Sequence, residues 1–333
     1  MRTVRLAAAI VAAGSLLAFA VPLRAQSQVL IVTGLGGEAR FTERFRSLGG
    51  ELATALHTRF GIPDANIAWL GEDSTARDPR YHGQSTRAAV EKEVVAIKAR
   101  GTPGAQDVLI FIGHGAGSEV DSRISLPGPD ITAADVKRWL TGFAQQRVAF
   151  VNLTSASGDF LPILAAPGRV VITATKTSFE RNESHFAGFF VKALSQDVAD
   201  VDKDGRVSLL EAFRYAARET KRVYDDATKL QTEHSQLDDD GSQQHTADPT
   251  GRAGQGMLAR RFFLDARTGG AVAGGDAALA ALYSQKFALE VQVDSVRARK
   301  ATTAREGYES ELERVLIELA RKSRDIRRAE GRP

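Results

Sequence analysis

A histidine and a serine each follow directly on a short apolar run. His114 comes after the run at 107–112, and Ser155 comes after the run at 147–153. A histidine can take the proton of a serine hydroxyl, and two backbone N–H groups, those of Gly115 and Ser155, can hold the oxyanion that follows. The pair therefore predicts a hydrolase with His114 as general base and Ser155 as nucleophile. The alternative is two residues without a joint task, since the sequence offers no obvious acidic partner for His114 and no Gly-x-Ser-x-Gly elbow.

The second segment with recognisable chemistry is the acidic stretch at 200–211. It fits the twelve-residue calcium loop position by position, with Gly205 at the sharp turn. A hard cation requires this many oxygen ligands, so calcium is the expected cofactor. The alternative is an acidic loop that only caps a helix. The expected ligands are Asp200, Asp202, Asp204, the backbone carbonyl of Arg206, Ser208 and Glu211.

A further acidic cluster, at 238–240, has no glutamate at the twelfth position of the pattern. We interpret it as either a weak cation site or a solvated loop. Because only the loop at 200–211 is complete, and sensors usually pair two, we expect that loop to be structural rather than a signalling element.

Apolar runs rich in β-branched residues alternate with segments of helical periodicity. Such runs are typical of strands buried on both faces of a parallel sheet, where functional residues lie at the carboxyl ends of the strands. We therefore expect an α/β fold with a mainly parallel sheet covered by helices on both faces, and His114 and Ser155 at one edge of it. The segment 71–84 is polar and is expected to be a loop. The expected strands are 28–33, 66–70, 107–112, 147–153 and 169–175, and the expected helices are 41–59, 86–100, 133–143, 185–194 and 209–222.

Composition and charge limit the function classes. The net charge of +3 over 333 residues argues against a nucleic-acid partner. The chain has no cysteine, which excludes both disulfides and a thiol nucleophile. Residues 1–25 have the basic start, short apolar core and small exit residue of a signal peptide, so we expect a secreted or periplasmic protein. The alternative is a retained membrane anchor, and no later stretch is apolar enough to span a membrane.

The carboxyl-terminal part differs in character from the rest. A Gly/Ala linker at 266–275 precedes a tail at 276–330 in which apolar residues recur every three and four positions among many charges. This pattern predicts one long helix or a helical hairpin of coiled-coil type. Such a tail either pads the main domain or lets it self-associate; the alternative is a partner-binding arm.

The motifs around His114 and Ser155 resemble those of the caspase/legumain-like (clan CD) cysteine peptidases. Ile-Gly-His-Gly at 112–115 is similar to the histidine motif of that family, and Thr-Ser-Ala-Ser-Gly at 154–158 is similar to its Ala-Cys-x-Ser-Gly motif. Ser155 stands where the family has its cysteine. The segment Ile-Thr-Ala-Thr at 172–175 also resembles the strand that follows in legumain-type members.

Over residues 28–265 the chain resembles, more specifically, exported bacterial proteins with a caspase-like domain and an embedded calcium loop. Thr-Glu-His at 232–234 and Leu-Asp-Asp at 237–239 belong to that likeness. The resemblance implies a three-layer sandwich with a mostly parallel six-stranded sheet over 26–265, and peptidase activity from a histidine–cysteine dyad.

The serine at position 155 changes the functional expectation. A thiolate is intrinsically nucleophilic, whereas a serine hydroxyl requires a well-oriented base. We therefore expect a pseudo-peptidase or strongly impaired peptidase that binds calcium and a peptide or protein ligand. The alternatives are an active endopeptidase that uses Ser155 with His114, and a structural cell-envelope protein that acts through its tail.

Overall fold

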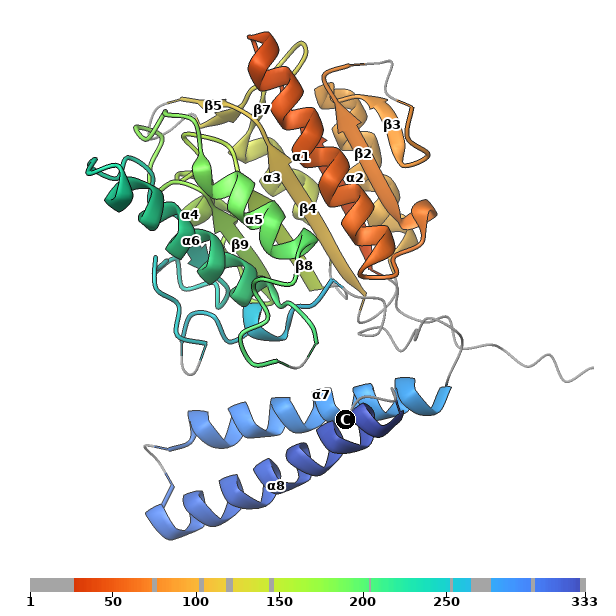
Figure 1. Cartoon of the computed structure of the whole chain (residues 1–333), viewed down its shortest axis with the longest axis vertical. Coiled ribbons are helices and arrows are strands. Elements are labelled where there is room, and N and C mark those ends of the chain that lie inside the picture. The colour runs from red at the N-terminus through yellow and green to blue at the C-terminus, as the bar shows by residue number, and fades with distance from the viewer. Residues whose placement is uncertain are drawn as a thin grey trace, which may run out of the picture.

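The computed structural model describes residues 27–73, 77–101, 105–117, 122–143, 147–203, 205–251, 254–264, 277–300 and 303–329. Its centre is a seven-stranded sheet with the order β10-β9-β8-β4-β1-β2-β3 (Figure 1). Six of these strands are parallel, and β10 is antiparallel to β9. The strands are β1 (Gln28–Thr33), β2 (Ile67–Gly71), β3 (Tyr81–Gln84), β4 (Gln106–Ile112), β8 (Arg147–Asn152), β9 (Arg169–Thr173) and β10 (Gln236–Asp238).

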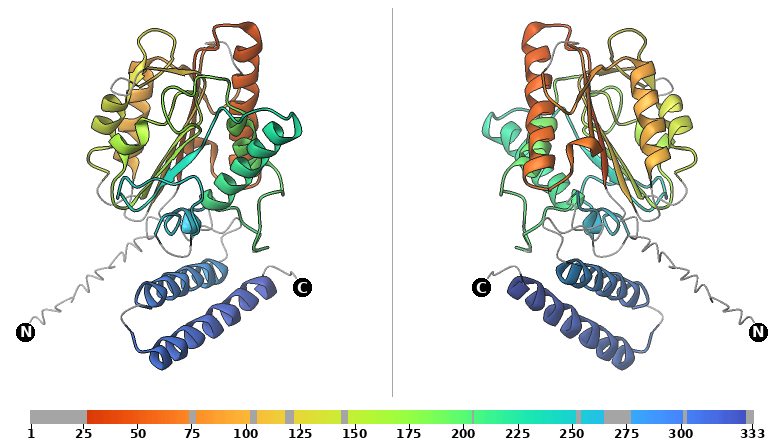
Figure 2. Two further views of the ribbon diagram at one scale, coloured as in Figure 1. Left: turned by 90° about the vertical axis from the view of Figure 1, so that its left-hand side faces the viewer. Right: turned by 90° about the vertical axis from the view of Figure 1, so that its right-hand side faces the viewer.

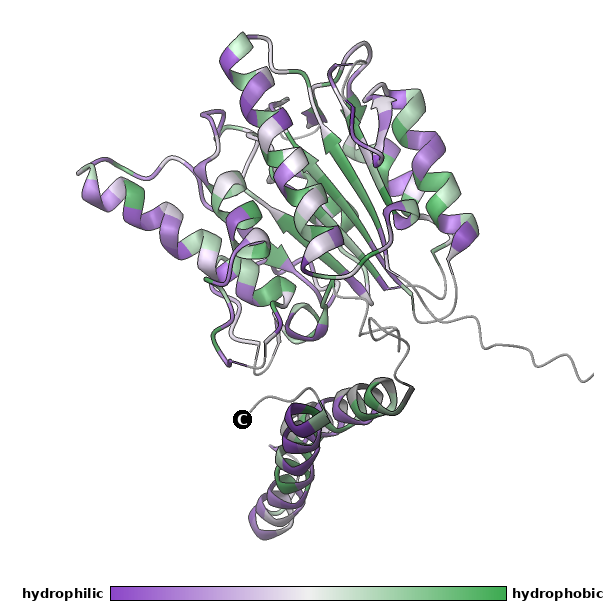
Figure 3. Ribbon diagram, turned by 45° about the vertical axis from the view of Figure 1, so that its right-hand side comes forward, coloured by the Kyte–Doolittle hydropathy of each residue, from purple (hydrophilic) through white to green (hydrophobic). Residues whose placement is uncertain are grey.

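Helices cover both faces of the sheet, which makes the main body a three-layer α/β sandwich (Figure 2). On one face lie α1 (Ala39–Thr58), α5 (His185–Ser195) and α6 (Leu209–Asp226); on the other lie α2 (Arg87–Arg100), α3 (Ala133–Leu140) and α4 (Phe160–Leu164). Alternate residues of β4 belong to the two cores, with Ile110 on one side and Leu109 on the other, and both are fully buried. This is why the central strands read as continuous apolar runs (Figure 3). The α/β class and the three layers are confirmed.

The strand count and one loop differ from expectation. The main sheet has seven strands instead of the expected six. The difference arises because both outer strands are short and polar in sequence. β3 forms within the segment 71–84 that we expected to be a loop, and its residues alternate between half-buried and exposed, as at a sheet edge. β10 is three residues long. Neither strand carries the apolar run on which the sequence interpretation depended.

A small second sheet lies beyond the carboxyl end of β4. Its three antiparallel strands are β5 (Gly115–Ala116), β6 (Arg123–Ile124) and β7 (Ile131–Thr132). It holds the backbone just after His114 in place, since the N–H of Ser125 donates to the His114 carbonyl at 3.0 Å.

The carboxyl-terminal tail is a helical hairpin rather than one long helix. Its helices are α7 (Ala277–Ala298) and α8 (Arg305–Ala329), which pack against each other (Figure 1). Leu279 and Ile326 form a small apolar cluster that is separate from the two cores of the sandwich. No helix in the described ranges combines the length and hydropathy that crossing a membrane requires. The expected signal peptide at 1–25 and the expected linker at 266–275 lie outside the described residues.

The separate clusters predict that the sandwich folds without the hairpin. A chain that ends at residue 275 is expected to unfold cooperatively, with a midpoint within about 5 °C of the full-length value, because neither core of the sandwich draws on α7 or α8. Thermal unfolding followed by circular dichroism checks this expectation. Loss of the cooperative transition would mean that the hairpin is part of the folding unit.

Candidate functional site

His114 and Ser155 lie at the same edge of the sheet, as expected. β4 and β8 are neighbouring parallel strands, with Phe111 paired to Asn152, so the residues just beyond their ends lie side by side. The structure nevertheless gives the two side chains different surroundings. No hydrogen bond joins them within the part of the chain that is described.

The His114 imidazole is held by helix α1 and by the loop after β1. Its ring meets Phe41 and Phe45 edge-on, with centroid distances of 4.6 and 5.0 Å. Burial lowers the pKa of His114, while a hydrogen bond to the backbone of Gly36 and the charge of Glu38 oppose that shift. The lowered pKa favours the neutral form of the ring, and the backbone of Gly36 faces it, a partner that the sequence did not indicate.

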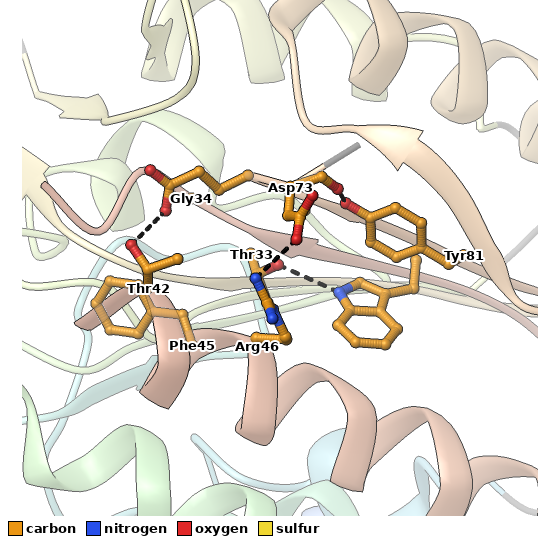
Figure 4. Close-up of a pocket in the computed structure, with 10 residues that line it drawn as sticks. Thr33, Gly34, Thr42, Phe45, Arg46, Asp73 and Tyr81 are labelled. Atoms are coloured by element: carbon orange, nitrogen blue, oxygen red, sulfur yellow. Dashed lines mark hydrogen bonds and ion pairs between the residues drawn. The ribbon is translucent and has the colours of Figure 1, made fainter. Parts of the chain in front are cut away.

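The loop that faces His114 is itself fixed by a carboxylate. Glu72 Oε2 accepts hydrogen bonds from the Gly36 N–H at 3.1 Å and from Thr42 Oγ1 at 2.7 Å. Figure 4 shows the small pocket at the ends of β1 and β2, where Arg46 pairs with Asp73. The cavity measures about 10 Å³, which is room for one water molecule at most. Side chains rather than a ligand thus fill this part of the edge.

The Ser155 hydroxyl faces the backbone of Gly115. Ser155 is only 2% exposed, and its Oγ accepts the Gly115 N–H at 3.2 Å and lies 3.5 Å from the Gly115 carbonyl oxygen. A Cβ at position 115 would lie 2.2 Å from the Ser155 carbonyl oxygen, so only glycine permits this approach. The N–H predicted to serve an oxyanion hole therefore donates to the predicted nucleophile.

The residue after Ser155 has a strained backbone. Ala156 has φ of 52°, in the left-handed region that non-glycine residues rarely adopt. Its N–H donates to the carbonyl of Glu180 at 2.8 Å. The Glu180 carboxylate accepts hydrogen bonds from Lys176 N–H and from His234, whose Nδ1 lies 2.5 Å from Oε1. The segment 176–183 thus braces the Ser155 loop.

Thr-Glu-His at 232–234 is explained by its contacts. The Glu233 carboxylate, 1% exposed, accepts from Ser184 Oγ and from the N–H groups of His185 and Phe186, which open helix α5. A buried carboxylate at a helix N-terminus is stabilised by these donors and by the helix dipole. Sequence reasoning missed Glu180 and gave Glu233 no role beyond the family likeness, because the partners of both lie far away in the chain.

The predicted calcium loop brings three of its carboxylates together. Oxygens of Asp200, Asp202 and Glu211 lie within 4.8 Å of one another. Gly205 has φ of 81°, and its N–H donates to Asp200 Oδ2 at 3.0 Å, which closes the sharp turn predicted at that position. Asp204 lies outside the described residues. The three clustered carboxylates are suited to a hard cation.

The remaining predicted ligands of the loop also have structural roles. Ser208 is the N-cap of α6 and forms a capping box with Glu211, in which Ser208 Oγ accepts the Glu211 N–H at 3.2 Å and Glu211 Oε2 accepts the Ser208 N–H at 2.9 Å. The Arg206 guanidinium lies 3.5 Å from the ring centroid of Phe263, and Ser208 forms a β-bridge with the same residue. Segment 262–264 therefore supports the loop.

The second acidic cluster stabilises a loop. Asp238 accepts the N–H groups of Gly241 and Gln243, and Asp239 accepts those of Gly256, Leu258 and Ala259. Burial raises the pKa of Asp239, and these backbone donors oppose the shift. Hydrogen bonds to backbone N–H groups thus explain why acidic residues are clustered here, and no cation is needed for that explanation.

The chain matches no protein-family model and no curated protein sequence. Its site therefore has to be interpreted from its own geometry.

Proposed function

We propose that this chain is an exported, calcium-binding protein of caspase/legumain-like architecture that acts by binding a peptide or protein and cleaves peptides weakly or not at all. The observation that carries the proposal is the position of the Ser155 hydroxyl. A serine nucleophile requires its base within about 3 Å and free donors for the oxyanion. Here the hydroxyl is buried against Gly115, and the Gly115 N–H is used by Ser155 itself.

Two further features support a binding role at this edge. Phe179 is 63% exposed and precedes Glu180, which braces the Ser155 loop. Arg181 donates to the Gly117 carbonyl at 2.9 Å and so links that segment to the loop after His114. An exposed aromatic residue on a fixed segment is the kind of anchor that peptide-binding surfaces use.

Calcium is proposed as the resident cation of the loop at 200–211. Asp200, Asp202 and Glu211 would hold it, with Asp204 and the backbone carbonyl of Arg206 completing the set that the spacing predicts. Such an ion would fix the connection between α5 and α6 and would carry no step of a reaction.

A serine endopeptidase is the second candidate, and two observations favour it. The lowered pKa of His114 favours the neutral form that a general base requires, and the backbone of Gly36 faces the ring. The positive φ of Ala156 places strain next to the predicted nucleophile, where active sites often store it. A shift of the Ser155 side chain toward His114 on substrate binding would complete the pair.

Peptide cleavage by the wild type, Ser155→Ala and Ser155→Cys separates the two functions. We expect cleavage of a mixed peptide library by the wild type to be no greater than by Ser155→Ala, and cleavage by Ser155→Cys to exceed that background about 10²-fold or more, because a thiolate needs less help from the base. The assay measures product peptides by mass spectrometry in the presence of calcium.

The alanine variant also serves as the folding control. Losing the acceptor for the Gly115 N–H is expected to cost only about 1 kcal/mol. Cleavage by the wild type that disappears in Ser155→Ala would establish the serine endopeptidase and overturn the proposed binding function. Cleavage that persists in Ser155→Ala would point to a contaminating peptidase.

A further inference from the structure

A groove of about 610 Å³ lies along helix α6, and neither His114 nor Ser155 lines it. One wall is the outer face of α6, and the other is formed by the segment 231–235 together with 247–248. Val201, between two of the predicted calcium ligands, closes one side. This volume falls within the range of sites that hold ligands.

The α6 wall of the groove is cationic. Arg214, Arg218 and Lys221 recur at helical spacing on this face, and all three are exposed. Arg218 pairs with the buried Glu219, and Lys221 pairs with the exposed Asp225. An exposed pair such as Lys221–Asp225 exchanges readily for other partners. The opposite wall carries His234, whose ring is held by Glu180, and one carboxylate, Asp248.

Apolar groups lie between and beside these charges. Val201 is 70% exposed, and Leu230, next to the lining residue Gln231, is 90% exposed. Ala217 lies between Arg214 and Arg218 on the floor of the groove. The groove thus combines a row of cations with the apolar side chains of Val201 and Ala217, and Leu230 is exposed beside a lining residue.

We propose that the groove along α6 binds an acidic peptide segment of a partner protein. Charge complementarity selects the occupant: carboxylates along the segment would pair with Arg214, Arg218 and Lys221, and its apolar side chains would cover Val201 and Leu230. The lining contains no Phe, Tyr or Trp ring on which a base could stack, and its cations lie beside aliphatic side chains. This combination favours a peptide over a nucleic acid.

Glu180 connects the groove to the Ser155 loop. His234 lines the groove and is held by Glu180, whose carbonyl accepts the Ala156 N–H. The inference rests on the proposed function, because it names the partner class of a protein that acts by binding. It is tested with the Ser155→Ala protein, so that binding is measured whether or not the wild type cleaves peptides.

The experiment selects short peptides from a random library on immobilised Ser155→Ala protein at a fixed calcium concentration. We expect the selected peptides to be rich in Asp and Glu with apolar residues between them. Their affinity, measured by fluorescence anisotropy, is expected to fall about tenfold in Arg214→Glu and in Lys221→Glu, since each reversal turns an attraction into a repulsion. Lys92→Glu, an exposed lysine of α2 on the other face of the sheet, is the matched control and should stay within about twofold of the parent.

Three outcomes would overturn the proposal. One is a selected pool without acidic residues, or no enrichment over the empty support. Another is equal binding by the α6 variants and the Lys92→Glu control. The last is displacement of the peptide by an oligothymidylate of equal charge at equal concentration, which would identify a general polyanion surface. None of these results depends on whether Ser155 is catalytic, so the proposed function can fail or stand separately.

Discussion

Adding calcium to the chelated protein is expected to raise the midpoint of thermal unfolding by about 5–10 °C. The folded loop brings Asp200, Asp202 and Glu211 within 4.8 Å, whereas the unfolded chain has no such site. Binding to the folded state alone stabilises by RT ln(1 + [Ca²⁺]/Kd), which is about 2.7 kcal/mol at a hundredfold excess over Kd. For a domain of this size, each kcal/mol corresponds to about 2–4 °C.

The variant Glu211→Gln separates the contribution of calcium binding to stability from the contribution of the helix cap. Glutamine can still close the capping box with Ser208, so the chelated variant should unfold close to the chelated wild type. It cannot supply a bidentate carboxylate, so the rise on adding calcium should be largely lost. Differential scanning fluorimetry with a chelator and then with excess calcium measures both quantities.

Asp240→Asn, in the second acidic cluster, is the matched control and should keep the full calcium response. Asp240 accepts hydrogen bonds from Ser242 N–H and Gln255 and is outside the carboxylate triad. A wild type whose unfolding midpoint does not move on adding calcium would contradict the calcium prediction. A full response in Glu211→Gln would place the ion elsewhere.

The sequence predicted those parts of the fold that depend on local pattern. The runs at 107–112 and 147–153 became β4 and β8 because strands buried on both faces must be continuously apolar. Parallel order then placed His114 and Ser155 at one edge without any knowledge of their contacts. The three-and-four spacing in the tail likewise predicted helices, but their packing as a hairpin required the structure.

The parts that escaped prediction depend on contacts distant in sequence. The group that faces His114 is the backbone of Gly36, and a backbone group leaves no residue type to recognise. Glu180 reaches the Ser155 loop through its own carbonyl, for the same reason. The use of Gly115 N–H by Ser155 could not be predicted either, because it depends on a side-chain rotamer rather than on spacing.

A buried carboxylate at the opposite end of β4 is expected to make the protein less stable at high pH. Asp107 is fully buried, and its carboxylate oxygens have no hydrogen-bond partner among the described residues. Burial raises its pKa to about 7, although Arg100 and the backbone of Gln28 oppose the shift. In the unfolded chain an aspartate titrates near pH 4. Between these values the folded state therefore binds more protons than the unfolded state.

Because the folded state binds more protons between these pH values, its stability falls as the pH rises. The contribution of neutral Asp107 to the free energy of unfolding is fully present below about pH 4. It is lost as the pH rises to about 7, where the carboxyl group also ionises in the folded protein. Asp107→Asn keeps the shape and removes the titration. The variant should equal the wild type in free energy of unfolding near pH 4 and exceed it by up to about 4 kcal/mol at pH 8, from about three pKa units at 1.36 kcal/mol each.

Urea unfolding of Asp107→Asn and the wild type across this pH range measures the difference directly. Asp226→Asn, at the exposed end of α6, removes the same charge from the surface and should show a nearly constant difference from the wild type. A constant difference for Asp107→Asn as well would mean that Asp107 is ionised in the folded protein, with water or Arg100 compensating its charge. A difference that grows with pH only in Asp107→Asn would establish that the base of the sheet holds a neutral carboxyl group.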